Sequence, residues 1–163
     1  MDILTIGLGT IGTTYSYLFN KAGHNVEHYI RKSSKKINIT ELNVDMLDGR
    51  NNKKGEHYTD IYRVSTHTKD NYDFIFISMP AGNIESVIET LNSNNIKGTI
   101  ILCCGIWEDK KYLEKIMQGR EYILGYPVAG GNIVDTTLTC CIFDHFILEK
   151  KENSKINNYD KLV

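Results

Sequence analysis

Short apolar runs alternate with amphipathic segments along the first part of the chain, which predicts strands that alternate with helices. Residues 3–6 are apolar and end at a glycine, as is typical of a buried strand. In residues 10–22 apolar side chains recur every three or four positions, so we expect a helix that Gly23 ends in a left-handed turn. Residues 26–30 form the next expected strand.

The same alternation returns after residue 70. Residues 74–79 are almost wholly apolar and predict a central strand, which Pro80 ends. The further expected elements are a helix with Ile84, Val87, Ile88 and Leu91 on one face, a strand over 99–103, a helix over 108–117 and a strand over 122–124. This order predicts a three-layer, Rossmann-like doubly wound α/β fold, with a mainly parallel sheet and helices on both faces.

Four segments fit this alternation less well. Residues 31–36 are basic and polar and indicate a loop, and residues 37–64 predict an extra hairpin, although their first part could be partly helical. Residues 126–131, "YPVAGG", indicate either a glycine-rich loop that approaches a ligand or a plain turn. Residues 136–148 are β-rich, and we expect them to return along the sheet edge.

The overall composition is that of an ordinary globular domain. The chain has 163 residues, of which 41% are hydrophobic, and 19 basic residues against 20 acidic ones give a net charge of -1. This balance argues against a nucleic-acid or membrane partner, since both usually require a marked basic excess. No apolar run approaches the roughly 18 residues that span a bilayer. We therefore expect a cytoplasmic protein.

The cysteines and histidines carry no recognisable metal pattern. Cysteines occur as the adjacent pairs 103–104 and 140–141, and on a strand each pair directs one thiol inward. We expect free thiols in a reducing compartment, with a disulfide or metal site as the alternative. The five histidines have no paired spacing. No metal ligand and no catalytic residue can be assigned.

A glycine-rich turn stands between the first expected strand and the first expected helix. In this G-x-G-x-x-G pattern Gly7 permits the tight turn, Gly9 lets the backbone approach a pyrophosphate, and Gly12 lets the helix pack closely on the strand. The N–H groups at the helix start would face the phosphates. A turn without ligand is the alternative. The candidate phosphate-binding residues are Gly7, Leu8, Gly9, Thr10, Ile11 and Gly12.

A basic pair follows the second expected strand, where NAD sites usually carry an Asp or Glu. Arg31 and Lys32 occupy this place. A guanidinium cannot accept a hydrogen bond from a ribose hydroxyl, but its charge and paired donors suit a 2′-phosphate. The alternative is a solvated basic loop. The sequence therefore favours NADP(H) over NAD(H) as the cofactor.

With these motifs the chain resembles the N-terminal domain of ketopantoate reductases (2-dehydropantoate 2-reductases), the NADPH enzymes of pantothenate synthesis. The resemblance covers nearly the whole chain. It lies in the glycine turn, in "VEHYIRK" with Arg31 where the family holds the 2′-phosphate, and in "YDFIFISMPAGNIESVIETL", "TIILCCGIW" and "YILGYPVAGG". Only the glycine turn and Arg31 are specific to it.

The chain departs from the family where the chemistry takes place. The resemblance implies a lysine at the position of Pro80 and an Asn-Gly pair where this chain has Cys104 and Gly105. It also implies that a catalytic lysine and the substrate-binding residues come from a helical C-terminal domain. A thiol is a much weaker hydrogen-bonding group than a carboxamide. Expected on the cofactor beyond the phosphates are Met79, Pro80, Cys104 and Gly105, the last three toward the nicotinamide.

We therefore interpret residues 1–149 as an NADP(H)-binding Rossmann domain and residues 150–163 as a linker or the start of a helical C-terminal domain. The expected function is hydride transfer between NADPH and a small 2-oxo acid, with little activity from this chain alone. The alternatives are a non-catalytic nucleotide-sensing or interaction module and another dehydrogenase of the same broad class. A small-molecule substrate and possible homodimerisation are expected, the latter through an exposed apolar patch.

Overall fold

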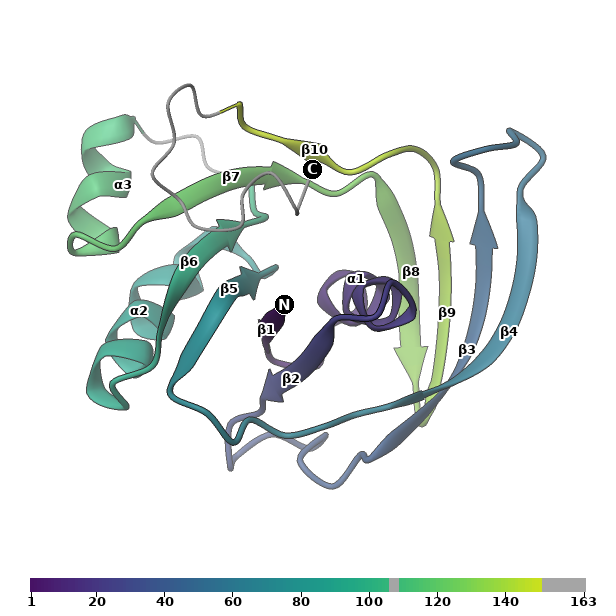
Figure 1. The fold of residues 1–163 in the computed structure, drawn as a ribbon, viewed down its shortest axis with the longest axis horizontal. Helices are drawn as coiled ribbons and strands as arrows, with labels where there is room; N and C mark the ends of the chain where they lie inside the picture. Colours follow the sequence, from purple (N-terminus) through teal and green to yellow (C-terminus); the bar gives the residue numbers. More distant parts are fainter. Residues whose placement is uncertain (106–108, 151–163) are drawn as a thin grey trace.

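The computed structural model describes residues 1–105 and 109–150, and its centre is a six-stranded, mainly parallel sheet (Figure 1). Its strands are β1 (Asp2–Ile6), β2 (Asn25–Tyr29), β5 (Asn71–Ile77), β6 (Lys97–Leu102), β7 (Tyr122–Tyr126) and β10 (Ile147–Leu148). They lie in the order β10-β7-β6-β5-β1-β2, and β10 alone runs antiparallel to its neighbour. The order reverses direction at β1, which confirms the doubly wound fold.

Helices cover both faces of this sheet, as the hydrophobic pattern predicts. On one face lies α1 (Thr10–Lys21), and on the other lie α2 (Ile84–Ser93) and α3 (Lys110–Met117) (Figure 1). A short 3-10 helix, η1 (Ala81–Asn83), precedes α2. Apolar side chains fill both layers: Leu4, Ile75 and Ile100 belong to the cluster that also holds the buried residues of α2 and α3. Phe74 and Phe76 belong to the cluster of Tyr15 on α1.

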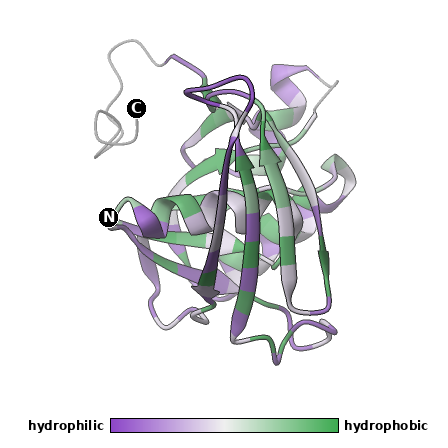
Figure 2. Ribbon diagram, turned by 90° about the vertical axis from the view of Figure 1, so that its right-hand side faces the viewer, coloured by the Kyte–Doolittle hydropathy of each residue, from purple (hydrophilic) through white to green (hydrophobic). Residues whose placement is uncertain are grey.

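A second sheet packs on the outer side of α1 and adds a fourth layer (Figure 1). Its strands are β3 (Glu41–Asp48), β4 (Glu56–Arg63), β8 (Ala129–Val134) and β9 (Thr137–Ile142), in the order β4-β3-β9-β8. Along β3 the residues Leu42, Val44 and Met46 are buried against α1, while the positions between them face outward or are partly exposed. Figure 2 looks onto this sheet, where apolar and polar residues alternate. The antiparallel pairing of β3 with β4 confirms the predicted hairpin.

Two expectations for the last third of the chain are wrong in part. The last residues of the predicted glycine-rich loop 126–131 belong to strand β8, where Gly130 pairs with Cys141 and Gly131 pairs with Cys140. Residues 136–148 do not form a single stretch along the edge of the central sheet. Instead, β9 joins the second sheet beside β3, and only β10 lies at the edge of the central sheet. The pairing of β9 with β3 joins segments almost a hundred residues apart, which no local pattern indicates.

All four cysteines are free thiols, as expected. In each adjacent pair one cysteine, Cys103 or Cys140, is buried and its neighbour is partly exposed. Residues 151–163, expected as a linker or helix start, and Glu108, the expected start of α3, lie outside the described residues. Within the described ranges no helix has the length and apolar character to cross a membrane.

Candidate functional site

A cleft of about 470 Å³ opens at the carboxyl ends of β1, β2 and β5. In open doubly wound sheets, ligands bind outside the carboxyl ends of the strands, at the point where the strand order reverses. Four segments form its walls: the glycine turn, the loop after β2, the segment after β5 and one side of α2. The residues that line it are Ile6, Gly7, Leu8, Gly9, Tyr29, Ile30, Arg31, Ser33, Ser34, Lys36, Ser78, Met79, Pro80, Asn83, Ser86, Val87, Thr90 and Leu91.

A larger hollow, about 560 Å³, lies at the opposite ends of the strands, away from the glycine turn. There the guanidinium of Arg120 donates to the Asn92 side chain and to the Ile96 carbonyl, each at 2.8 Å. The hollow lies at the amino ends of β5, β6 and β7, opposite the end at which doubly wound sheets bind their ligands. The cleft at the carboxyl ends is therefore the candidate site.

The glycine turn leaves the start of α1 open to the cleft. Gly7 has φ +82°, a conformation that side chains disfavour, and its N–H donates to the Tyr29 carbonyl at 2.8 Å. Gly9 is the N-cap of α1, and no side chain caps this helix end. The first helical bond runs from Thr13 N–H to the Gly9 carbonyl at 2.9 Å. The amides of the first turn and the helix dipole thus form a site for an anion.

The last glycine of the turn is required by packing. A Cβ atom on Gly12 would lie 3.2 Å from Cγ2 of Thr5 and 3.9 Å from Cβ of Ser78. A Cβ on Gly9 would meet only the Ser78 carbonyl oxygen, at 4.0 Å. The fold itself therefore constrains Gly12, whereas Gly9 faces open space that a ligand can approach.

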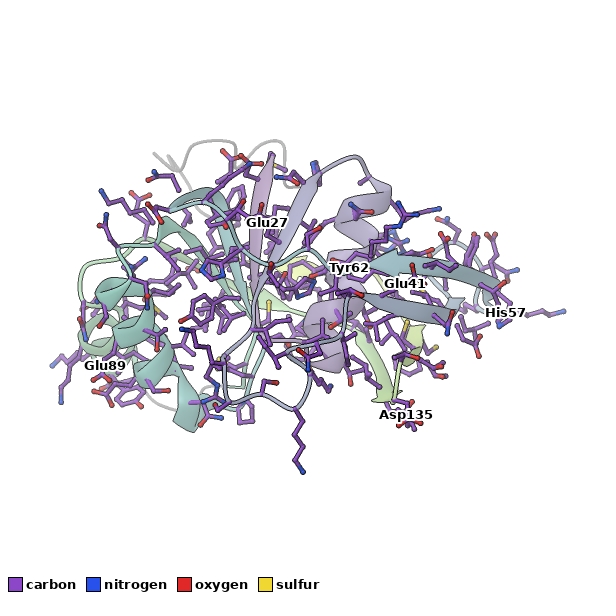
Figure 3. The ribbon with its side chains drawn as sticks, turned by 90° about the horizontal axis from the view of Figure 1, so that it is seen from below. Glu27, Glu41, His57, Tyr62, Glu89 and Asp135 are labelled. Carbon is purple, nitrogen blue, oxygen red and sulfur yellow. The ribbon has the colours of Figure 1, made fainter. Side chains whose placement is uncertain are left out.

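A buried histidine, His28, supports the glycine turn from the protein interior. In His28 on β2, Nδ1 donates to the Gly7 carbonyl at 2.9 Å, and Nε2 accepts from the Tyr62 hydroxyl at 2.8 Å. Tyr62 reaches from β4 into the interior (Figure 3). Burial lowers the pKa of His28 and raises that of Tyr62, so the ring is neutral and the phenol protonated. The sequence left His28 without a role, since its neighbours on β4 are distant along the chain.

The loop after β2 folds back over the cleft. Arg31 and Lys36 both line it, whereas Lys32 and Lys35 are exposed and do not. The Nζ atom of Lys36 donates a hydrogen bond to the carbonyl of Leu8, in the glycine turn, at 2.8 Å. Two cations from one loop therefore converge on this cleft.

None of the described residues that line the cleft is acidic. The carboxylate of β2, Glu27, is buried and accepts hydrogen bonds from Tyr72 and from Thr68. Burial alone would raise the pKa of Glu27, but these hydrogen bonds outweigh it and hold the pKa below its usual value. Glu89 lies on α2 with its side chain exposed (Figure 3). The electrostatic character of the cleft is therefore set by its cations.

The structure brings only part of the predicted site into the cleft. The predicted residues that line it are Gly7, Leu8, Gly9, Arg31, Met79 and Pro80. Those that do not are Thr10, Ile11, Gly12, Lys32, Cys104 and Gly105. Cys104 and Gly105 follow β6 at the same edge of the sheet, one strand beyond β5, and Gly105 faces open space. The chief residues that the sequence missed are Ser33, Ser34, Lys36 and the α2 side chains Ser86, Val87, Thr90 and Leu91.

The expected glycine loop does not reach this cleft. Gly130 and Gly131 lie in the second sheet and are absent from the cleft lining. Similarly, among the described residues no group of three or more His, Cys, Asp or Glu side chains could hold a metal ion.

The sheet order, the glycine turn and the position of the cleft define a Rossmann-like α/β domain of the kind found in dehydrogenases. A model of the family described as ketopantoate reductase PanE/ApbA matches residues 3–130. The chain therefore belongs to the ketopantoate reductase PanE/ApbA family. None of the curated proteins searched matches the chain.

Solved structures share the fold at low sequence identity. A 2-dehydropantoate 2-reductase from Geobacter metallireducens is 15% identical, with a TM-score of 0.69 over 99% of this chain and 53% of that one. A dimeric ketopantoate reductase from Staphylococcus aureus is 14% identical, with a TM-score of 0.63 over 100% and 51%. A D-mandelate dehydrogenase with NADH and anilino(oxo)acetate is 16% identical, with a TM-score of 0.67 over 99% and 52%. The chain thus spans about half the length of these structures.

Proposed function

We propose that this chain is the NADP(H)-binding part of a ketopantoate reductase-like oxidoreductase that transfers hydride between NADPH and a small 2-oxo acid. When bound, NADPH supplies the hydride. One observation carries the proposal: the open start of α1 and the Arg31 guanidinium line one cleft, in which no described lining residue is acidic. An anionic dinucleotide fits this arrangement.

The cofactor would lie across the cleft in one direction. Its pyrophosphate would bind the first-turn amides beside Gly9, and its 2′-phosphate would bind Arg31. The adenine would rest on the apolar side of the cleft, formed by Ile30, Val87 and Leu91. The nicotinamide would then extend past Met79 and Pro80 toward Cys104 and Gly105, where β5 and β6 end.

The fold alone does not choose between the two cofactors, because the D-mandelate dehydrogenase of the same fold was solved with NADH. The preference for NADP(H) rests on the charges of the cleft. An NAD site needs a carboxylate acceptor for the ribose 2′-hydroxyl at the end of the second strand. This position carries Arg31 instead, and Glu27 is held by Tyr72 and Thr68.

We propose that residues 1–149 bind the cofactor, that residues 150–163 lead out of this domain, and that substrate-binding groups come from a further region. The half-length match to the solved reductases supports this division. This chain alone would then be a weak catalyst. A second candidate, a nucleotide-sensing module without activity, is favoured by Pro80 and Cys104, which replace the lysine and the asparagine of the family pattern. Steady-state oxidation of NADPH with ketopantoate at a rate typical of enzymes would exclude that candidate, and it would also contradict the weak activity proposed for this chain alone.

A homodimer in the cytoplasm completes the proposal. On the pair β7–β10 the large apolar side chains Leu124, Tyr126 and Ile147 are exposed, and Ile147 is the register partner of Tyr126. Such a patch favours association, and the four free thiols fit a reducing compartment. Light scattering should detect a dimer, and a monomer at all concentrations would contradict it.

The cofactor proposal is tested by titrating the wild-type chain with NADPH and NADH, following nicotinamide fluorescence. We expect NADPH to bind at least about tenfold more tightly, because charge-assisted contacts to the 2′-phosphate are lost with NADH. Equal or tighter binding of NADH would refute the proposal.

A further inference from the structure

We propose that Lys36 is a second cation for the ribose 2′-phosphate and acts with Arg31 to select NADP(H) over NAD(H). This inference rests on the NADP(H) binding proposed above and adds to it a residue that determines specificity. Of the four basic side chains between residues 31 and 36, only two line the cleft, namely Arg31 and Lys36.

Successive backbone turns direct Lys36 into the cleft. The N–H of Ser34 donates to the Arg31 carbonyl at 2.8 Å, and the N–H of Ile37 donates to the Ser34 carbonyl at 3.2 Å. The Ser34 hydroxyl accepts from the N–H of Lys36 at 3.2 Å. These bonds coil the loop, so that its first and last residues, Arg31 and Lys36, return to the same cleft, while Lys32 remains exposed outside it.

The ammonium group of Lys36 is already held in place. Its Nζ donates to the Leu8 carbonyl at 2.8 Å, and the side chain is partly buried. An ammonium carries three N–H donors, so this bond leaves two of them for a ligand. A long side chain normally loses rotamer freedom when it binds, and anchoring at Leu8 reduces that cost in advance.

The position of this ammonium fits the 2′-phosphate better than the pyrophosphate. Lys36 belongs to the loop that follows β2, and the end of this strand is where Rossmann sites contact the 2′ position of the ribose. The pyrophosphate already has the first-turn amides of α1. Ser33 and Ser34, which lie between the two cations in the sequence, also line the cleft, and serine hydroxyls are donors that a phosphate accepts.

Two matched variants test the inference. Lys36→Met removes the charge but keeps an unbranched apolar stem, and Lys35→Met makes the same change at an exposed lysine outside the cleft. We would measure the Kd of each for NADPH, NADH, 2′,5′-ADP and ADP by calorimetry, together with the melting temperature of the free proteins. We expect Lys36→Met to weaken the binding of NADPH and 2′,5′-ADP about tenfold. The binding of NADH and ADP should weaken less than about twofold. Lys35→Met should change none of the four Kd values, and Lys36→Arg should retain the preference for NADPH over NADH.

Other outcomes overturn the inference. If Lys36→Met weakens NADPH and NADH equally, Lys36 only holds the glycine turn, and selection does not depend on it. If Lys36→Met leaves the Kd values for both cofactors unchanged, Arg31 alone binds the 2′-phosphate. In both cases a wild type that prefers NADPH leaves the proposed function intact. A wild type that binds neither cofactor, or prefers NADH, refutes the proposed function and this inference with it.

Discussion

The two ends of the cleft differ in how closely their residues follow the pattern of the ketopantoate reductase family. At the phosphate end, the uncapped start of α1, Arg31 and Lys36 converge, and His28 supports the turn from the interior. At the nicotinamide end, Pro80 stands where the family pattern has a lysine, and Cys104 follows β6 outside the cleft lining. Under the proposed function, the chain carries the groups that would hold a dinucleotide and differs from the family pattern at those that would touch the reacting ring.

If the proposal holds, cofactor binding and chemistry are carried by separate parts of the fold. Phosphate binding would use backbone amides and two cations from adjacent segments of one half-sheet, which a domain of this length can supply. Hydride transfer would also need a substrate anchor and a proton donor, which we propose come from a further region. Substitutions at the two ends should therefore have different consequences.

The largest effect is expected at Gly9. A Cβ at this position would have only the Ser78 carbonyl oxygen nearby, at 4.0 Å, so Gly9→Val should leave the free fold intact. The added side chain would occupy the space of the pyrophosphate, and we expect both cofactors to bind about a hundredfold more weakly, because close backbone approach is lost. Calorimetric Kd values and the melting temperature check this, with Gly82→Ala, also in open space, as the control. Unchanged binding would place the pyrophosphate elsewhere.

A smaller and more selective effect is expected at Arg31. Removing its guanidinium by Arg31→Ala should weaken NADPH about thirtyfold, since hydrogen bonds to charged groups contribute about 1.5–3 kcal/mol. The affinity for NADH should fall by less than about threefold, because NADH lacks the 2′-phosphate. Fluorescence titration of both cofactors measures the two changes. An equal loss of affinity for both cofactors would show that Arg31 does not bind the 2′-phosphate.

The support beneath the phosphate end should make stability depend on pH. The pKa of His28 is lowered from its ordinary value of 6.5 by burial, so well above pH 6.5 the ring is neutral in both folded and unfolded chains. As the pH falls below 6.5, the unfolded chain takes up the proton first, and stability decreases. We expect a loss of the order of 1 kcal/mol per pH unit in urea denaturation.

His28→Gln provides the matched control for this pH effect. The amide can still donate to the Gly7 carbonyl but cannot titrate, so the extra slope below pH 6.5 should disappear. If wild type and variant show the same slope, other groups cause it.

The smallest effect is expected at the nicotinamide end. The double variant Pro80→Lys with Cys104→Asn restores the family pattern there, and we expect the Kd for NADPH to change by less than about threefold, because the phosphate contacts dominate binding. Titration of the double variant beside the wild type checks this. A tenfold gain would mean that the two ends are not independent.

The central sheet could be predicted because its signals are local. The apolar run over residues 74–79, the helical spacing of Ile84, Ile88 and Leu91, and the glycine turn each indicate one element within a few residues. A parallel sheet with both faces covered then follows from the alternation of strands and helices.

The β3–β4 hairpin of the second sheet could be predicted, but the addition of β8 and β9 to it and half of the site could not, because they depend on distant contacts. Gly131 suggested a loop, since glycine is unfavourable in strands. In the structure a Cβ there would clash with the Thr139 carbonyl oxygen, so β8 needs glycine for its close approach to β9. Likewise, nothing in "RKSSKK" distinguishes Lys36 from Lys35; the turns of the loop and the Leu8 carbonyl do.

The most direct test of the account is a crystal structure of the chain with bound NADPH. The account places the pyrophosphate at the amides beside Gly9 and the 2′-phosphate between the side chains of Arg31 and Lys36. A cofactor whose 2′-phosphate points into solvent, or a cleft that stays empty at saturating NADPH, would contradict it.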